Sequence, residues 1–319
     1  MIILSGGAGF IGSNLLKELN NRQIYDIVIV DDIDHSFKPE NLENSKYREI
    51  VPINNFWQWE EQNKNLNIDT FFHLGACSDT LETDKDYLYE NNVVYSQRLW
   101  QMAIKHDSNF IYASSAATYG IGDNGFDDNE KTIDQLKPLN EYGKSKNNFD
   151  LWAINELSKP PFWVGLKFFN VYGPYEDNKG KMASVVHWGL RKVHEEKEIR
   201  LFKSLHSDYK DGYQTRDFIF IEDVVDIIFF FKKNNLSGIF NVGTGNPQTF
   251  LHLAENLFES LSFEKNIKYI DMPEELIDIY QYYTCANINK LRSAGYNKQF
   301  TSLKKGVEIC KNYFLNTIK

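Results

Sequence analysis

A tyrosine and a lysine four residues apart, Tyr142 and Lys146 in the segment NEYGKSK, form the pair best suited to chemistry in this sequence. If the segment is helical, this spacing places both side chains on one face. A nearby ammonium group favours phenolate, so Lys146 is predicted to lower the pKa of Tyr142 and make it a general acid/base. Ser115 and, secondarily, Thr118 could hydrogen-bond the oxygen whose proton Tyr142 handles. The alternative is a half-buried tyrosine beside a solvated lysine, since the spacing is common by chance.

The chain begins with a second chemical motif, a glycine-rich turn in the sequence SGGAGFIGSNLLKEL. Gly7, Gly9 and Gly12 satisfy the spacing G-x-G-x-x-G. Gly6 extends the motif to the wider spacing G-x-x-G-x-x-G. Glycine permits positive φ in a tight turn and lets the backbone approach a pyrophosphate, while the N-terminus of a following helix adds free N–H groups. The motif therefore predicts a dinucleotide phosphate site.

The surroundings of these glycines support this interpretation. An apolar run precedes them, an amphipathic segment at residues 11–19 follows, and an apolar segment at residues 27–30 ends in Asp31 and Asp32. In such a strand, turn, helix and strand unit, the acid at the end of the second strand can bind the ribose hydroxyls. Asp31 is the predicted ribose ligand. The alternative is a plain strand–turn–helix without a ligand.

The form of the nicotinamide cofactor is left open by the residues near the second strand. Adjacent Asp31 and Asp32 should repel a 2′-phosphate and favour NAD. His35 and Lys38 follow them and could offset that repulsion, which would allow NADP. Both cofactors therefore stay possible on local grounds.

Further along the chain, apolar segments typical of strands alternate with helical segments. Strands are expected at residues 69–76, 109–115 and 162–171, and helices at residues 87–106 and 140–155. Such alternation is typical of a mostly parallel sheet with helices on both faces. The predicted fold class is therefore α/β, a Rossmann-type doubly wound parallel sheet, whose ligands bind at the carboxyl ends of its strands.

The pattern becomes looser and more mixed after residue 171. The elements expected there are helices at 182–192 and 223–231, a polar segment at 204–215, and short strands at 239–242 and 267–272. We interpret residues 1–170 as an NAD(P)-binding Rossmann domain, with later returns at about 216–238. Residues 171–319 are then a smaller, interleaved mixed α/β domain for the substrate.

The composition excludes several classes of function. The chain has 35 Lys and Arg residues against 44 Asp and Glu, a formal net charge of -9 with no basic block, which argues against a nucleic-acid partner. Three widely separated cysteines suggest neither a disulfide framework nor a zinc or other metal site. The longest apolar runs, such as residues 227–231, are too short for a membrane span, and the N-terminus has no leader pattern. We therefore expect a cytoplasmic protein without a membrane partner.

Taken together, the motifs resemble a known family. The glycine turn, Asp31, the serine pair that ends the strand at residues 109–115 and the Tyr142-x-x-x-Lys146 pair resemble the extended short-chain dehydrogenases/reductases. These are the NAD-dependent epimerases and dehydratases that modify nucleotide sugars. Two later segments, TRDFIFIEDV at residues 215–224 and FNVGTG at residues 240–245, are similar to the segments that mark the nucleotide-sugar side of the site in this family. The resemblance covers nearly the whole chain.

Five longer segments narrow the resemblance: HLGACSDT, YASSAATYG, PLNEYGKSK, FFNVYGPYEDNKGKMASV and AGYNKQF. They are similar to the family members that invert the C6″ centre of an ADP-linked heptose in lipopolysaccharide core biosynthesis. Dehydratases of the family carry an acidic pair after the strand that corresponds to residues 109–115, where this chain has two alanines before Thr118. Another NAD(P)-dependent nucleotide-sugar epimerase or reductase is the alternative. A third interpretation, a cofactor-sensing regulator without catalysis, is disfavoured because Tyr142, Lys146 and Ser115 are all present.

The resemblance also implies a mechanism. A bound nicotinamide cofactor, NADP in the family with NAD possible here, would remove a hydride from C6″ and return it to the opposite face. The hydroxyl at an inverted centre lies differently before and after, so a second acid/base eases the proton transfers. By resemblance the two acid/bases are Tyr142 and Lys179, and Lys146 and Ser115 complete the catalytic set. A solvated loop lysine is the alternative for Lys179, whereas Lys181 is expected at the rim of the site.

The same resemblance implies contacts to both ligands. The expected cofactor contacts are Gly6, Gly9, Phe10, Ile11, Gly12, Asp31, Asp32, Lys38, Leu74, Gly75, Ala76, Cys77, Ser78, Asn91, Lys146, Val171 and Lys179. The expected contacts of the nucleotide-sugar substrate are Ser115, Asn170, Lys181, His187, Phe202, Arg216 and Tyr280. Arg216 suits a diphosphate because its guanidinium can bind two phosphate oxygens at once. Family members self-associate, so a homo-oligomer is expected.

Overall fold

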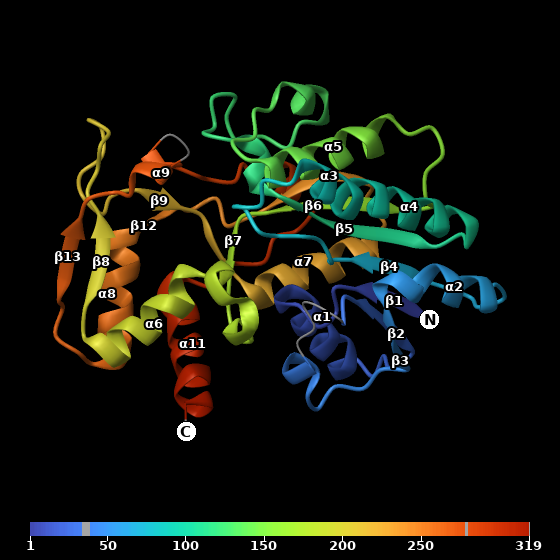
Figure 1. Ribbon diagram of the computed structural model, residues 1–319, viewed down its shortest axis with the longest axis horizontal. Helices are drawn as coiled ribbons and strands as arrows, with labels where there is room; N and C mark the ends of the chain where they lie inside the picture. Colours follow the sequence, from blue (N-terminus) through green and yellow to red (C-terminus); the bar gives the residue numbers. More distant parts are fainter. Residues whose placement is uncertain (34–38, 278–279, 319) are drawn as a thin grey trace.

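A seven-stranded parallel sheet forms the centre of the computed structural model, which describes residues 1–33, 39–277 and 280–318 (Figure 1). Its strands in spatial order are β11 (Gly238–Val242), β6 (Trp163–Phe168), β5 (Asn109–Ser115), β4 (Thr70–His73), β1 (Ile2–Ser5), β2 (Ile27–Asp31) and β3 (Glu49–Pro52). From β1 the chain first runs outward through β2 and β3, then returns to the other side of β1 with β4. The order therefore reverses between β1 and β4, where ligands of open α/β sheets bind.

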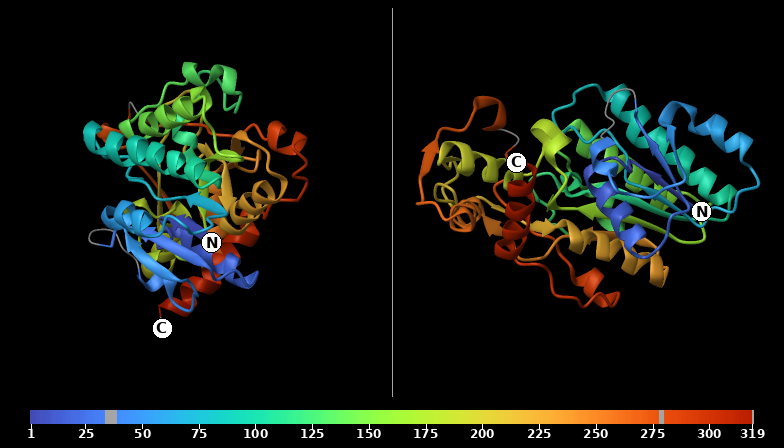
Figure 2. Two further views of the ribbon diagram at one scale, coloured as in Figure 1. Left: turned by 90° about the vertical axis from the view of Figure 1, so that its right-hand side faces the viewer. Right: turned by 90° about the horizontal axis from the view of Figure 1, so that it is seen from below.

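Helices cover both faces of this sheet, and the strands supply apolar residues to both. Alternate strand residues point to opposite faces, so Ile2 and Leu4 join one core cluster while Ile3 joins the other. The first cluster packs under α1 (Phe10–Asn21) and α7 (Ile221–Asn234); the second packs under α2 (Phe56–Gln62), α4 (Tyr95–Lys105) and α5 (Glu141–Asn155). The right-hand view of Figure 2 shows α4 (teal) and α7 (gold) on opposite sides of the strands. The predicted doubly wound fold is confirmed.

The predicted helix at residues 87–106 is interrupted by a wider turn. It consists of α3 (Lys85–Tyr89), a π-helical turn η3 (Glu90–Val94) and α4. Asp84 begins it, because its carboxylate accepts a hydrogen bond from the Tyr87 N–H. A π turn inserts one residue into the helical repeat and is frequent at functional sites.

Two strand predictions need correction. The apolar segment 162–171 divides into β6 and a separate strand β7 (Asn170–Tyr172), which leaves the large sheet and pairs with β10 (Phe218–Phe220). The strand expected at 239–242 in the smaller part is instead β11, the edge strand that pairs with β6 in the large sheet. Both errors have one cause: apolar runs identify buried strands, but the sheet that they join depends on distant residues.

The remaining elements lie mainly at the left of Figure 1. They include α6 (Val185–Glu196), α8 (Phe250–Leu261), α11 (Leu303–Thr317), the parallel pair β8 (Ile199–Phe202) and β13 (Ile267–Ile270), and the antiparallel pair β9 (Thr215–Arg216) and β12 (Gln248–Thr249). Helix α6 begins later than the predicted residue 182, because Ser184 caps it by accepting the His187 N–H. Short elements complete the chain: η1 (Pro39–Leu42), η2 (Ile53–Asn55), η4 (Ala116–Tyr119), η5 (Glu130–Gln135), η6 (Asp177–Met182), α9 (Glu274–Ile277) and α10 (Asn289–Ser293). Within the described residues, no helix is long and apolar enough to cross a bilayer.

Trp100 on α4 joins four elements of the second core cluster. Its ring centroid lies 5.5 Å from that of Phe110 on β5, 6.4 Å from Phe149 and 5.7 Å from Trp152 on α5, and 5.2 Å from Trp163 on β6. The side chain is fully buried. Aromatic pairs at these separations add to the free energy of apolar burial.

We expect Trp100→Ala to lower the free energy of unfolding by about 3–5 kcal/mol, because it removes this burial and leaves a cavity. Urea denaturation followed by circular dichroism measures the change. Leu157→Ala is the matched apolar control, since Leu157 is 96% exposed and should change stability little. Equal effects of the two substitutions would contradict this account of the core.

Candidate active site

Two glycine turns meet at the point where the strand order reverses. Gly6 follows β1 with φ +70°, and a Cβ atom there would lie 2.5 Å from the Cα of Gly75, which follows β4. A Cβ at Gly75 would in turn lie 2.9 Å from the Gly6 nitrogen. Only glycine permits this approach. The turns after β1 and β4 therefore form one continuous floor.

The start of α1 is free to bind an anion. Gly9 precedes the helix without a side-chain cap, so the first N–H groups of α1 are available to a ligand. A Cβ at Gly12 would lie 2.1 Å from the Gly6 carbonyl oxygen, so this position holds the helix against its own turn. Phe10 is buried at the first helical position, and Ile11 follows it. This is the geometry that a pyrophosphate requires.

Asp31 ends β2 beside the glycine turn and is almost fully buried. Its Oδ2 accepts the Ala8 N–H at 2.8 Å, and its Oδ1 accepts the Asp32 N–H at 2.9 Å. Burial raises the pKa of Asp31, and the two backbone hydrogen bonds oppose that rise. Each carboxylate oxygen can still accept a ribose hydroxyl, because it has a second lone pair. Lys38, the predicted partner of a 2′-phosphate, lies outside the described residues.

The predicted cofactor segment from Leu74 to Ser78 is held by an asparagine that the sequence did not single out. Asn92, on the π turn η3, accepts the Cys77 N–H at 2.9 Å and donates to the Cys77 carbonyl at 2.9 Å. It also donates to the Ser145 hydroxyl at 3.0 Å. Asn91, the predicted residue, instead donates to the Tyr87 carbonyl on its own helix and is partly exposed. In this structure Asn92 therefore supports the loop, and Asn91 does not bond to it.

A buried histidine links this support to β1. His73 accepts or donates at both ring nitrogens, 2.6 Å from the Ser5 hydroxyl and 2.8 Å from the Ser96 hydroxyl. Ser96 in turn donates to the Asn92 carbonyl at 2.7 Å. Burial lowers the pKa of His73 to about 3, so the ring is neutral at physiological pH. His73 is thus a structural histidine behind the cofactor loop.

The predicted catalytic pair lies on α5, as expected from its spacing. Asn140 caps this helix by accepting the Gly143 N–H at 2.7 Å, which places Tyr142 in the first turn. Tyr142 forms a side-chain hydrogen bond with Ser115. Lys146 is buried and donates to the Ala113 carbonyl at 3.1 Å. The structure therefore brings Tyr142, Ser115 and Lys146 together at the end of β5.

The prediction that Lys146 lowers the pKa of Tyr142 is wrong for this arrangement. Burial raises the pKa of Tyr142, and the principal opposing contribution is its hydrogen bond with Ser115. Burial also lowers the pKa of Lys146, to about 8. The ammonium group is directed to the Ala113 carbonyl, so its effect on the phenol is not the dominant one.

The prediction that Thr118 binds the reacting oxygen also needs correction. Its side chain is fully buried. Its hydroxyl donates to the Ser115 carbonyl at 2.9 Å and accepts from the Lys167 ammonium at 2.7 Å. Thr118 therefore supports Ser115 from behind and does not face a substrate.

Lys179 lies in the short helix η6, close to the start of α1. Its ammonium group is 3.3 Å from the Glu176 carboxylate and 4.7 Å from the centre of the Phe10 ring. Glu176 is completely buried, and it also accepts the Gly173 N–H at 3.1 Å and the Ser184 N–H at 2.7 Å. Neither partner of Lys179 is Tyr142 or Ser115. Glu176, which the sequence did not single out, holds the loop on the cofactor side of the site.

Other predicted residues lie around this loop. Burial lowers the pKa of His187, and the carboxylates of Asp177 and Glu176 oppose this. Asn170 is exposed at the start of β7, and Val171 beside it is half-buried. Lys181 is exposed, as expected for a residue at the rim.

The residues of the smaller part that are predicted to bind the substrate form an aromatic and cationic cluster. The Arg216 guanidinium lies 5.4 Å from the ring centres of both Phe250 and Tyr280. Phe202 at the end of β8 meets Tyr280 edge-to-face at 6.0 Å. Arg216 is 8% exposed, and burial lowers its pKa. Three elements thus bring Phe202, Arg216 and Tyr280 together, and a buried cation there favours an anionic ligand.

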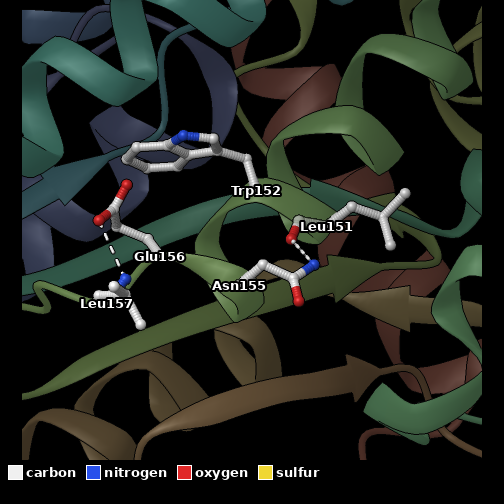
Figure 3. A pocket seen from close by; sticks show the side chains of 5 residues that line it. All are labelled: Leu151, Trp152, Asn155, Glu156 and Leu157. Atoms are coloured by element: carbon white, nitrogen blue, oxygen red, sulfur yellow. Dashed lines mark hydrogen bonds between the residues drawn. The ribbon is translucent and has the colours of Figure 1, made fainter.

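A hollow of about 410 Å³ lies elsewhere, on the last turn of α5 (Figure 3). Its lining is Leu151, Trp152, Asn155, Glu156 and Leu157. Tyr142 lies at the opposite end of this helix, about 20 Å away along its axis. The hollow therefore contains none of the predicted site residues.

The residues present fit a nicotinamide dinucleotide. The paired glycine turns leave space that a Cβ atom would fill, the uncapped start of α1 suits a pyrophosphate, and Asp31 suits a ribose. Tyr142, Lys146 and Ser115 then stand at the end of β5, where such a cofactor would present its nicotinamide. The fold and the site together define an NAD(P)-dependent oxidoreductase-type enzyme of the short-chain class.

Comparisons with known proteins agree with this class. Residues 2–243 match the NAD dependent epimerase/dehydratase family, and the chain belongs to this family. An ADP-L-glycero-D-manno-heptose-6-epimerase of Fusobacterium nucleatum is 44% identical over 326 residues, covering 99% of this chain and 97% of its own. The enzyme of the same description from Nitratidesulfovibrio vulgaris is 45% identical over 309 residues, covering 96% and 95%.

Solved structures are similar as well. The Helicobacter pylori ADP-L-glycero-D-manno-heptose-6-epimerase superposes with a TM-score of 0.82 at 29% identity, covering 98% of this chain and 96% of its own. A UDP-N-acetylglucosamine 4-epimerase from Methanobrevibacter ruminantium gives a TM-score of 0.85 at 21% identity, covering 99% and 98%. The second likeness concerns the fold alone.

We expect Gly12→Ala to abolish retention of a nicotinamide dinucleotide while leaving the secondary structure intact. The new Cβ would push α1 away from the Gly6 carbonyl and displace the N–H groups at the start of the helix. The nucleotide released on denaturing the purified protein, measured by absorbance and mass, reports the effect. Gly125→Ala is the control for glycine strain, since Gly125 has φ +74° but open space around it. Full retention by Gly12→Ala would contradict the assigned phosphate site.

Proposed function

We propose that this enzyme interconverts ADP-D-glycero-β-D-manno-heptose and ADP-L-glycero-β-D-manno-heptose by inverting C6″. The observation that carries the proposal is the placement of Tyr142 and Ser115 at the end of β5, in a chain similar over nearly its full length to heptose epimerases. The anion-binding cluster around Arg216 suits the diphosphate of such a substrate. The reaction belongs to the isomerases.

The residues of the chain have distinct roles in this proposal. A bound nicotinamide cofactor would supply the hydride acceptor for C6″ and the hydride donor to its opposite face. Tyr142, in its phenolate form, removes the proton of the C6″ hydroxyl as the carbonyl forms, and Ser115 holds that oxygen by a hydrogen bond. Lys146 orients the cofactor ribose beside Tyr142. After the sugar turns over, the Lys179 ammonium donates a proton of its own to the oxygen in its new position, and Tyr142 and Lys179 regain their starting forms by proton exchange with water.

Lys179 must leave its partner to perform this step. In the structure it is paired with Glu176, and 28% of its side chain is exposed. Glu176 keeps its bonds to the Gly173 N–H, the Ser184 N–H and the Ser184 hydroxyl without it. The ammonium group can therefore turn toward a substrate while the loop stays in place.

The cofactor in this proposal is NADP, with NAD as the alternative. Family membership supports a nicotinamide cofactor of either form. Asp31 and Asp32 favour an unphosphorylated ribose, whereas the family resemblance favours NADP. Mass analysis of the nucleotide that the purified enzyme releases would distinguish the two.

Three further expectations belong to this proposal. The large sheet and the elements after residue 171 act as cofactor and substrate domains, the enzyme works in the cytoplasm, and it self-associates. A different nucleotide-sugar epimerase or reductase is the second candidate, because one fold can host several activities that differ only in the site. Substrate choice depends on the surroundings of Phe202, Arg216 and Tyr280.

We expect the purified enzyme to epimerise ADP-D-glycero-β-D-manno-heptose without added cofactor. Proton NMR of the incubation should show signals of the L-glycero product appearing until equilibrium. A folded, cofactor-loaded enzyme that leaves C6″ unchanged would exclude this substrate. Epimerisation of a UDP-sugar in the same assay would support the second candidate.

We expect Lys179→Met to reduce turnover by about 100-fold or more, because it removes one of two acid/bases. Bound cofactor should remain, since Glu176 still holds the loop. The matched control is Lys192→Met, which removes an exposed lysine paired with Glu196 on α6. Near-normal turnover of the Lys179→Met variant would contradict this role and show that Lys179 is a solvated loop residue.

A further inference from the structure

A completely buried ion pair lies directly beneath the catalytic residues. The Lys167 ammonium on β6 is 2.7 Å from the Asp150 carboxylate on α5, and both side chains are 0% exposed. Removing two charges from water costs several kcal/mol per ion unless further hydrogen bonds compensate. Such a pair is weak evidence for stability alone, so its place in the site requires another explanation.

Both charges of this pair have further polar partners. Asp150 accepts from the Tyr112 hydroxyl at 2.9 Å and from the Ser114 hydroxyl at 2.7 Å, in addition to Lys167. Lys167 also donates to the Thr118 hydroxyl at 2.7 Å. A buried network of this kind fixes the relative positions of the elements that contribute to it. These elements are β5, η4, α5 and β6.

The network contacts the catalytic site from two sides. On α5, Asp150 lies one helical turn beyond Lys146 and two turns beyond Tyr142, so the three side chains share a face. On the other side, Thr118 donates to the Ser115 carbonyl at 2.9 Å. Lys167 thereby fixes the strand end that carries Ser115, and Asp150 fixes the helix that carries Tyr142.

Asp150 also sets the charge environment of Lys146. Burial lowers the pKa of Lys146, and the Asp150 carboxylate is the main group that opposes this. The other groups around Lys146 are Tyr142 on α5, Cys77 after β4, His73 on β4 and the Ala113 carbonyl on β5, with Lys167 behind Asp150. His73 is neutral, as described above. Among these groups, Asp150 is the charged one that most favours the ammonium form.

We propose that the Asp150–Lys167 pair is a positioning device for the catalytic residues: Asp150 keeps the Lys146 ammonium charged, and Lys167, through Thr118, holds Ser115 against Tyr142. An apolar pair of equal volume would fill the same space but supply no field at Lys146. The catalytic part of this inference rests on the proposed epimerase function. The effect of Asp150 on the charge of Lys146 is independent of that function.

The two members of the pair act on Lys146 with opposite signs, which provides the test. The protein with its bound cofactor, labelled with ¹³C at the lysine ε carbon, is titrated by NMR, and Lys146→Arg identifies the Lys146 signal. Asp150→Asn removes a carboxylate that stabilises the ammonium, so the Lys146 midpoint should move about 1 pH unit or more lower. Lys167→Met removes a competing cation, so the midpoint should move higher. Midpoints that move in the same direction, or do not move, would overturn the proposal.

Activity gives the second readout. In the epimerase assay, the pH above which Asp150→Asn loses turnover should be lower than for wild type, with KM for the nucleotide sugar unchanged. Glu141→Gln is the control, because it removes a carboxylate from the first turn of the same helix, where Glu141 is paired with Lys144 near the surface. If wild type itself does not epimerise the heptose, the proposed function fails, while the NMR midpoints still decide the present inference.

A combined variant covers the case in which a single variant does not fold. Asp150→Asn with Lys167→Met leaves no unpaired buried charge, so it should fold by circular dichroism and retain cofactor. We expect its turnover to fall about tenfold or more, because Ser115 and Tyr142 lose their fixed separation. Turnover equal to wild type in this variant would show that the pair only fills space.

Discussion

The close approach of the turns after β1 and β4 is the constraint on which the rest of the site depends. Gly6 and Gly75 come together only because neither has a Cβ atom. This contact fixes the distance between the start of α1 and the loop at residues 74–78. A dinucleotide that binds the first turn through its phosphates must then extend over the second, toward the end of β5.

The predicted catalytic end of the site is held by polar groups. The Asn92 amide connects the loop after β4 to Ser145 on α5, and Ser145 donates to the Tyr142 carbonyl at 2.7 Å. Buried polar groups of this kind tolerate little movement, because each lost bond leaves an unpaired group in the interior. The arrangement of Tyr142 relative to the cofactor loop is therefore set by hydrogen-bond geometry, whereas the sheet beneath it is set by apolar packing.

The sequence predicted the α/β sheet and the helix that carries Tyr142 and Lys146, because apolar periodicity and glycine spacing are local properties. It did not predict that residues 239–242 would close the large sheet, since strand order depends on distant contacts. Thr118 was predicted to bind the reacting oxygen, but its hydroxyl instead accepts a hydrogen bond from Lys167. A signal for that network was visible: Lys167 is a charged residue inside an apolar strand, and such a residue needs a buried partner. The partner itself, Asp150, could not be identified without the fold.

The π turn between α3 and α4 has a consequence for how this chain can vary. Neighbouring helical residues point about 100° apart, so Asn91 bonds along its own helix while Asn92 reaches the loop at residues 74–78. Deleting one residue within Glu90–Val94 would restore a regular α-helix and remove the wider turn that carries Asn92. The segment is therefore a place where length, more than residue type, is constrained, and insertions or deletions tolerated in surface loops would be excluded here.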